Sequence, residues 1–301
     1  MKAIVTGGNG FIGSHLVDRL IDLGWRVDVI DNLSAECNDE FYYNERATNH
    51  EIDICDYDAI LPIFEGADVV FHMAAESRIQ PAIINPTRAA EVNVVGTCNV
   101  LQASRMQNVG RVIYSSTSAG YGLANTPPLH EGMPRDCLNP YSVTKCAGED
   151  LCTMYTRLFG LDTIVFRYFN VYGERSPTKG QYAPVIGLFF VQKAAQEHLS
   201  LVGDGLQRRD FTHVDDVVAA NLAAATTTNR DAIGETFNVG TGINHSILEI
   251  AQMISDNIKH IPPRPAEART TLANIAKITG ALAWAPQVQL ETWIEEALSG
   301  L

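Results

Sequence analysis

A glycine-rich stretch at residues 6–13 constrains the fold of this chain more than any other feature of its sequence. It reads Thr-Gly-Gly-Asn-Gly-Phe-Ile-Gly, follows an apolar run at residues 3–5, and opens a segment whose apolar residues recur with helical spacing. A strand, a glycine turn and a helix in this order are typical of dinucleotide-binding sites, where glycines let the backbone turn tightly and approach a pyrophosphate. The N–H groups at the start of such a helix face the phosphates. The stretch therefore predicts an α/β fold that binds a dinucleotide here; the alternative interpretation is a plain glycine turn.

The next apolar run, at residues 27–31, predicts a second buried strand that ends in Asp31. A carboxylate at this position can hold the adenosine ribose hydroxyls and would repel a 2′-phosphate, so it favours NAD over NADP. The alternative for Asp31 is a strand-end cap. Residues 35–50 are predicted to form a loop, and a short third strand is expected at residues 51–54. Asp53 in that strand would lie at the adenine edge or be solvated.

Strands and helices continue to alternate along the chain. Strands are predicted at residues 68–72, 111–114 and 161–168, and helices at residues 87–107 and 140–159. Sequential units of this kind predict a doubly wound parallel (Rossmann) sheet. We expect residues 1–172 to form an NAD-binding domain and residues 173–301 to form mainly a smaller C-terminal α/β substrate domain. A helix at residues 185–197 is expected in the second part, and segments near 213–240, a helix at 214–225 and a strand at 236–239, are expected to return to the first.

The composition limits the partners and the location. A formal net charge of −13 and a pI of about 5.0 argue against nucleic acid or an anionic membrane as the main partner. The 6 cysteines form no Cys-x-x-Cys pair and no Cys/His cluster has ligand spacing, so we predict small buried thiols in a reducing compartment and no metal site. We expect no signal peptide, the sequence has no apolar run long enough to span a bilayer, and the cytoplasm is the expected location.

Tyr141 and Lys145 begin the helix predicted at residues 140–159 and share one of its faces, because they are four residues apart. An isolated tyrosine has a pKa of about 10 and is a poor base near neutrality. A lysine ammonium close to the phenol oxygen favours the phenolate, so we expect the pKa of Tyr141 to be lowered and Tyr141 to act as a base. His72, at the end of the strand predicted at 68–72, is interpreted as a packed histidine and not a ligand.

Taken together, these motifs resemble the extended short-chain dehydrogenase/reductases, in their nucleotide-sugar epimerase/dehydratase branch. The resemblance covers nearly the whole chain. The segments that carry it are Gly7-x-x-Gly10-x-x-Gly13, Asp31-Asn32, His72-x-Ala-Ala75, Asn93, residues 115–122, Asn139-Pro-Tyr141-x-x-x-Lys145, residues 167–173, residues 202–205, residues 209–216 and Arg264-Pro-Ala-Glu267.

The resemblance implies an NAD-bound enzyme that oxidises C4 of a nucleotide-linked hexose. Tyr141 would take the proton of the 4-hydroxyl, Lys145 would lower the tyrosine pKa and hold the nicotinamide ribose, and Thr117 would hydrogen-bond the 4-oxygen. The residues implied to bind NAD are Gly7, Gly10, Phe11, Ile12, Gly13, Asp31, Asn32, Ser34, Asp53, Ile54, Ala74, Ala75, Asn93, Ser115, Tyr141, Lys145 and Tyr168. The residues implied to bind the sugar nucleotide are Ser77, Thr117, Tyr141, Asn170, Leu201, Arg209, Arg264 and Glu267. The planar fork of arginine pairs well with phosphate, and interdomain salt bridging is the alternative for both arginines.

The residues after Thr117 indicate which reaction to expect. Dehydratases of this family carry an Asp-Glu pair there, and the related decarboxylases carry a glutamate at the second position. This chain has Ser118-Ala119. Without a carboxylate, dehydration lacks its acid/base partner, so oxidation followed by return of the hydride remains, which is 4-epimerisation of a nucleotide hexose. The alternatives are a nucleotide-4-keto-sugar oxidoreductase, which Asp31 disfavours, and a non-catalytic dinucleotide sensor, which the intact tyrosine and lysine disfavour.

Two further expectations follow from the resemblance. Thr271 falls near a position where some 4-epimerases carry a tyrosine that crowds the 2-substituent of the sugar, and the smaller residue would admit N-acetylated sugars. The helices at 87–107 and 140–159 would form the contact of a homodimer.

Overall fold

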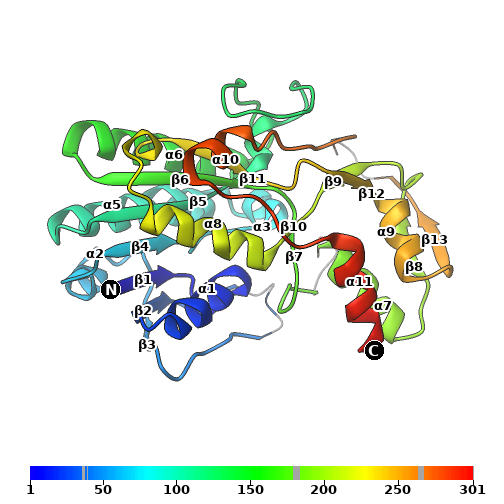
Figure 1. Ribbon diagram of the computed structural model, residues 1–301, viewed down its shortest axis with the longest axis horizontal. Coiled ribbons are helices and arrows are strands. Elements are labelled where there is room, and N and C mark those ends of the chain that lie inside the picture. Colours follow the sequence, from blue (N-terminus) through cyan, green and yellow to red (C-terminus); the bar gives the residue numbers. More distant parts are fainter. Residues whose placement is uncertain (36–37, 39, 179–183, 264–267, 301) are drawn as a thin grey trace.

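The structure is a computed structural model that describes residues 1–35, 38, 40–178, 184–263 and 268–300. Its centre is a seven-stranded parallel sheet in the order β11-β6-β5-β4-β1-β2-β3 (Figure 1). The strands are β1 (Lys2–Thr6), β2 (Arg26–Asp31), β3 (Thr48–Glu51), β4 (Val69–His72), β5 (Arg111–Thr117), β6 (Asp162–Tyr168) and β11 (Thr236–Val239). The strand order reverses between β1 and β4, so the predicted doubly wound Rossmann sheet is confirmed.

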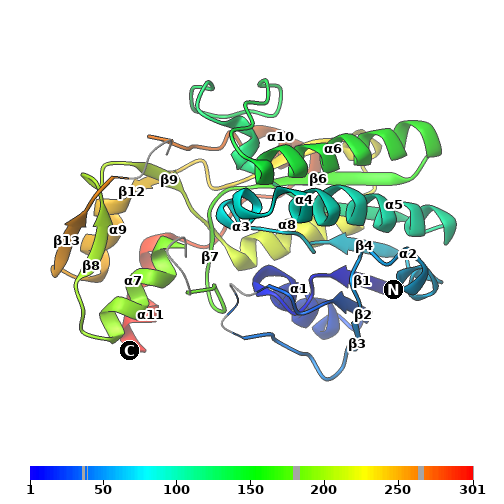
Figure 2. The same ribbon diagram turned by 180° about the vertical axis from the view of Figure 1, so that it is seen from behind.

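Helices cover both faces of the sheet, because parallel strands joined by helical crossovers are buried on both sides. One face packs against α1 (Phe11–Asp22), α8 (Val214–Thr226) and α10 (Ala276–Leu282) through residues such as Leu16, Val217 and Ile278. The other packs against α2 (Tyr57–Ile60), η1 (Leu61–Phe64), α5 (Thr97–Met106) and α6 (Pro140–Phe159) through residues such as Val100 and Cys152. Figure 2 shows α5 and α6 lying along the strands from the second side.

Helix α6 begins and ends where its sequence predicts. Asn139 accepts the N–H of Ser142 at 2.9 Å and the Asn139 N–H bonds back to the Ser142 hydroxyl, which forms a capping box with Pro140 in the first turn. Gly160 ends the helix with φ +72°, a left-handed conformation that favours glycine.

The third strand and the helix predicted at 87–107 differ from the prediction. The third strand is Thr48–Glu51 and not 51–54, because it is a polar edge strand whose place is set by its pairing with β2 from Asp28 to Asp31. The helix predicted at 87–107 is several pieces, namely α4 (Pro86–Ala90), a π-helical segment η2 (Glu91–Gly96) and α5, preceded by α3 (Ile79–Ile84). A Cβ at Gly96 would lie 2.6 Å from Ile54, so η2 is packed tightly against the chain after β3.

The C-terminal part forms a second core beside the carboxyl ends of the central strands (Figure 1). Its elements are α7 (Val185–Ala194), β8 (Leu199–Val202), β9 (Arg208–Asp210), β12 (Asn244–Ser246), α9 (Ile247–Ile254), β13 (Ile258–Ile261) and α11 (Leu290–Ser299). The short strands β7 (Val171–Tyr172) and β10 (Thr212–His213) pair with each other, and η3 (Ser118–Tyr121) and η4 (Arg230–Ala232) are single turns. Helix α7 is shorter than the helix expected at 185–197.

Three later segments lie against the first core. β11 pairs with β6, α8 packs on α1, and the Trp284 indole donates to the Asp216 carbonyl at 3.0 Å. The return of α10 and Trp284 was not among the expectations. The boundary at residue 172 stays a prediction. Among the described helices, none combines the length and apolar character that a bilayer span requires.

Candidate active site

A cavity of about 940 Å³ lies at the carboxyl ends of the central strands. Its walls come from the segments that follow β1, β2, β4, β5 and β6, and from residues of the C-terminal part such as Gln207, Arg209 and Thr271. Ligands of open α/β sheets bind at this edge, where the strand order reverses. The glycine turn, Asp31 and the Tyr141–Lys145 pair all line this one cavity.

The glycine turn leaves no room for a side chain at Gly7 or Gly13. Gly7 has φ +69°, and a Cβ there would lie 2.7 Å from the Ala74 nitrogen. A Cβ at Gly13 would overlap the Gly7 carbonyl oxygen, whereas Gly10 has only ordinary contacts and lines the cavity. Helix α1 starts at Phe11 without a side-chain cap, so its first N–H groups are presented at the cavity edge. This backbone cradle fits the pyrophosphate of a dinucleotide.

Asp31 is held at the end of β2 by two backbone N–H groups. Its carboxylate accepts from Asn9 at 3.1 Å and from Leu33 at 2.9 Å, and burial raises its pKa. Asn32 turns away and donates to Asp53 at 2.9 Å. Asp53 also pairs with Arg88 at 2.6 Å. Asp31 lines the cavity with its carboxylate fixed by these two N–H groups, which suits a ribose diol.

Asp53 is neither free nor simply solvated. Burial acts to raise its pKa, but hydrogen bonds from the Cys55 N–H and from Arg88 outweigh burial and lower the pKa to about 2. The ion pair with Arg88 lines the cavity beside Ile54, and Ser34, which donates to Asn32 at 2.7 Å, lies on the same rim. The structure therefore places these predicted cofactor contacts together.

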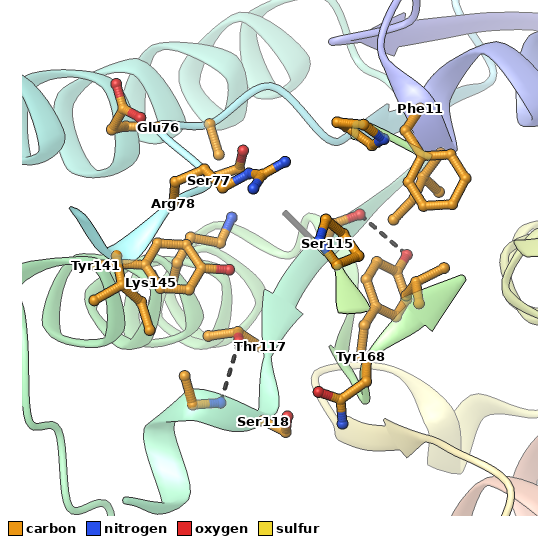
Figure 3. Close-up of a pocket in the computed structure, with 18 of the residues that line it drawn as sticks. Phe11, Glu76, Ser77, Arg78, Ser115, Thr117, Ser118, Tyr141, Lys145 and Tyr168 are labelled. Carbon is orange, nitrogen blue, oxygen red and sulfur yellow. Dashed lines mark hydrogen bonds between the residues drawn. The ribbon is translucent and has the colours of Figure 1, made fainter. Parts of the chain in front are cut away.

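The predicted catalytic residues converge at the other end of the cavity. Thr117 ends β5, and Tyr141 and Lys145 lie on the first two turns of α6. A side-chain hydrogen bond links Tyr141 to Thr117. Figure 3 shows the Tyr141 hydroxyl and the Lys145 amine pointing into the same space, with Thr117 beneath them and Ser115 and Tyr168 opposite. The hydroxyls of Ser115 and Tyr168 are 3.0 Å apart.

The pKa of Tyr141 differs from the expectation. Burial raises it above the ordinary value of 10.0, and the hydrogen bond to Thr117 offsets only part of this rise. Lys145 is only 3% exposed, with its amine 4.3 Å from the centre of the Tyr114 ring, and burial lowers its pKa to about 7. The prediction that Lys145 brings the tyrosine pKa below its usual value is wrong for the protein by itself, because desolvation of the phenol is the larger effect.

The comparisons with known proteins agree with this geometry. The model of the NAD dependent epimerase/dehydratase family matches residues 3–240. The chain belongs to this family. It is 35% identical to a UDP-glucose 4-epimerase of Mycolicibacterium smegmatis, over 99% of this chain and 97% of that one.

Two further relatives of this epimerase/dehydratase chain are informative. It is 35% identical to a UDP-N-acetyl-alpha-D-glucosaminuronate decarboxylase of Bacillus cytotoxicus, over 87% of this chain and 83% of that one. Its structure matches the crystal structure of a UDP-glucose 4-epimerase from Thermotoga maritima with UDP-glucose, with a TM-score of 0.92, 32% identity, and coverage of 99% and 98% of the two chains. The predicted family, Rossmann fold and NAD cofactor are confirmed.

Several of the other residues expected to bind NAD or the sugar nucleotide line the cavity. These are Ile12, Ala75, Ser77, Asn170 and Arg209. Asn170 donates to the Asp210 carbonyl at 2.9 Å. Arg264 and Glu267 lie outside the described residues. Residues that line the cavity without having been expected include Arg78, Leu129 and Leu188.

Two expected ligand contacts lie behind the cavity wall. Asn93 is buried and holds the loop after β4 to α6, accepting from the Glu76 N–H at 2.8 Å and donating to Thr144 at 3.0 Å. The Leu201 side chain is fully buried in the C-terminal core, while its neighbours Ser200 and Val202 line the cavity. The packed role expected for His72 is confirmed, since it bonds to Thr6 at 2.7 Å and Thr97 at 2.9 Å.

A buried ion pair that the sequence reasoning missed supports the catalytic residues. Glu149, on α6 one turn after Lys145, is 1% exposed and accepts two hydrogen bonds from Arg167 at 2.9 and 2.7 Å. It also accepts from Ser116 at 2.6 Å and from Arg135 at 3.0 Å. Ser116 precedes Thr117 and Arg167 precedes Tyr168, so one carboxylate ties α6 to the ends of β5 and β6. The sequence signal for this pair was a charged residue in an apolar strand pattern, Arg167, together with a charged residue in a helix pattern, Glu149.

Proposed function

We propose that this protein interconverts nucleotide hexoses that differ at C4, with UDP-glucose and UDP-galactose as the substrate pair and NAD as the cofactor. The observation that carries the proposal is Ser118-Ala119 directly after Thr117, in a site that keeps Tyr141 and Lys145. The similarity values alone do not separate the reactions, because an epimerase and a decarboxylase are both 35% identical to the chain.

The acidic residues that do line the cavity are poorly placed to serve as a base for dehydration. Asp31 and Asp53 lie at the end of β2 and near Arg88, at the adenosine end. Glu76 comes from the loop after β4, and its carboxylate points away from Thr117 in Figure 3. A reaction that only moves a proton and a hydride at C4 therefore suits this site best.

Each of the three catalytic side chains has a separate role in this reaction. Bound NAD, held by the glycine turn and Asp31, would supply the hydride acceptor for C4 and a positive charge that favours the Tyr141 phenolate. Tyr141, as the phenolate, takes the proton of the 4-hydroxyl, and Lys145 supplies positive charge beside it. Thr117 hydrogen-bonds the same oxygen. After the sugar has turned so that its other face meets the cofactor, Tyr141 gives the proton back to the 4-oxygen and C4 is inverted.

The rest of the cavity would hold the nucleotide and leave the sugar loose. Arg209 and Asn170, and in the sequence Arg264, are proposed to hold the diphosphate, where the planar fork of arginine pairs with phosphate oxygens. Thr271 borders the cavity and is small enough to leave space for a 2-acetamido group, so UDP-N-acetylhexoses are proposed as further substrates. UDP-GlcNAc turnover tests that extension.

We infer that two copies pair through the helices at one side of the sheet. Large apolar side chains are exposed on η2, α5 and α6, including Val95 at 51%, Met106 at 54%, Val143 at 52% and Leu158 at 68%. Burying them against a second copy would remove apolar surface from water. We also propose a cytoplasmic location, which the free thiols of the described cysteines support.

The test uses purified protein with no added cofactor. It should convert UDP-glucose to UDP-galactose, and Tyr141→Phe should lower the rate by about 10²–10⁴-fold. Tyr155→Phe is the matched control, because Tyr155 lies on the same helix but bonds to Gln102 at 3.1 Å. A rate within tenfold of wild type for Tyr141→Phe would disprove the proposed base, and carbon dioxide release from a UDP-hexuronate would favour decarboxylation.

A further inference from the structure

Two cysteines meet beside the catalytic lysine. Cys137 lies in the loop that leads into α6, and Cys146 directly follows Lys145 on that helix. Their sulfur atoms are 3.5 Å apart. Cys137 is partly exposed, whereas Cys146 is 3% exposed. The other partly exposed cysteines contact different atoms; the Cys98 sulfur, for example, lies 3.8 Å from the Tyr155 hydroxyl.

The loop that carries Cys137 is part of the cavity wall. Leu138 and Asn139 line the cavity. Asp136 donates its N–H to the Gly120 carbonyl at 2.9 Å, and its carboxylate accepts from the Leu123 N–H at 2.8 Å. The loop is therefore bound to the segment that follows Thr117.

Helix α6 touches the same segment through Cys146. A Cβ on Gly120 would lie 2.7 Å from the Cys146 sulfur, so no larger residue than glycine fits there without movement. The cysteine pair thus lies where the cavity loop, the turn after Thr117 and the helix of Tyr141 and Lys145 meet.

We propose that Cys137 and Cys146 form a reversible intrachain disulfide when the protein meets a peroxide, and that this disulfide slows turnover at the neighbouring site. The sulfur of the partly exposed Cys137 attacks hydrogen peroxide, which forms an S–O bond, breaks the O–O bond and releases water. The Cys146 thiolate then attacks the sulfenic sulfur, forms the S–S bond and displaces the oxygen as a second water. Two thiols are oxidised and one peroxide is reduced, and a dithiol reverses the reaction by exchange.

The environment sets the order and pace of these steps. Burial raises the pKa of Cys146 to about 12, so its thiolate is scarce near neutrality. Cys137 is therefore the sulfur that reacts first, and closure by Cys146 is the slow step. We expect the disulfide to form faster as the pH is raised.

Closure would move the cavity wall. A disulfide needs its sulfur atoms about 2.05 Å apart, so the pair must approach by roughly 1.5 Å. That approach draws the loop towards the residue after Lys145. Misplacement of catalytic groups by about 1 Å can cost 10²-fold in rate, so we expect the oxidised protein to lose at least tenfold in turnover.

The test treats the full-length protein with hydrogen peroxide and then reads the bond and the activity separately. Trypsin cleaves after Arg135, Lys145 and Arg157, which puts the two sulfurs on different peptides, 136–145 and 146–157. Digestion without reductant, followed by mass spectrometry, should find these peptides linked. Turnover of UDP-glucose should fall at least tenfold and return after dithiothreitol. Failure of the mass assay is distinguishable from failure of the proposed epimerase activity, because peptide linkage needs no substrate.

Single cysteine substitutions show which thiols cause the link and the loss of turnover. Cys137→Ser and Cys146→Ser should each be unable to form the link and should keep their activity in peroxide, while Cys98→Ser should behave as wild type. Because peptide 146–157 also contains Cys152, a link that persists in Cys146→Ser would overturn the proposal. Equal inhibition of wild type and Cys137→Ser, or a linked protein with unchanged turnover, would overturn it as well.

Discussion

Replacement of Glu149 by glutamine should destabilise the protein far more than its conservative size suggests. Glu149 and Arg167 are 1% and 4% exposed, and their closest contact is 2.7 Å. Burial acts to lower the pKa of the Arg167 guanidinium, but the bond to Glu149 outweighs burial and raises the pKa, so Arg167 stays charged in the core. Glutamine keeps the shape of the side chain and removes only its charge.

The size of the effect follows from the geometry. At 2.7 Å and an effective dielectric constant of about 20, the attraction between two unit charges is about 6 kcal/mol. Transfer of each ion from water costs several kcal/mol, so the intact pair contributes little net stability. The variant loses the attraction but still buries Arg167, and breaking a buried pair in this way costs about 3–5 kcal/mol. Arg135, the second cation at Glu149, would keep only its contact with Asp150.

Urea unfolding measures this loss as a change in the free energy of unfolding at constant m-value. Asp150→Asn is the matched control. Asp150 is the next residue on α6 and pairs with the same Arg135 at 2.7 Å, but its side chain is 69% exposed, so its loss should cost less than about 1 kcal/mol. The assay is run on cofactor-free protein, so that bound NAD does not mask the difference.

Equal destabilisation by the two variants would refute the reasoning, since only Glu149 is buried and bonded to the buried Arg167. A Glu149→Gln variant within about 1 kcal/mol of wild type would show that the buried arginine finds another partner or reaches water. In that case the carboxylate would not be what ties α6 to the ends of β5 and β6.

Three further outcomes are expected. Gly13→Ala should abolish the retention of NAD through purification, measured by absorbance, because its Cβ would overlap a carbonyl oxygen of the turn, whereas Gly280→Ala, with open space around it, should retain NAD. Absorbance titration of cofactor-free protein, taken as the difference from Tyr141→Phe, should place the Tyr141 pKa above 10.0, and addition of NAD should lower it; a value below 10.0 without NAD would show that Lys145 alone suffices. Burial lowers the pKa of His72 from 6.5 to about 3, so between these values the unfolded chain binds a proton that the folded protein does not, and stability is lost as the pH falls. Between pH 7 and pH 5, the free energy of unfolding measured with urea should therefore fall by about 2 kcal/mol less for His72→Gln than for wild type. Equal falls in the two proteins would contradict the buried neutral histidine.

Features of the chain that depend on local interactions could be predicted well from the sequence. The start of α6 at Asn139-Pro140 follows from a cap and a proline within a few residues of each other. The Rossmann sheet follows from apolar strands that alternate with amphipathic helices. The third strand was misplaced because β3 is polar and exposed, and only its pairing with β2 sets its position.

The glycine turn, the acid at the end of β2, and the tyrosine and lysine on one helical face could all be located from the sequence, because backbone conformation and helical spacing act between near neighbours in the chain. The surroundings of those groups depend on the folded chain. Desolvation depends on side chains from distant segments, so the raised pKa of Tyr141, the lowered pKa of Lys145 and the buried carboxylate of Glu149 could not be predicted from spacing. The contact of Cys137 with Cys146 likewise exists because a long loop folds back onto the helix it precedes, which no local pattern encodes.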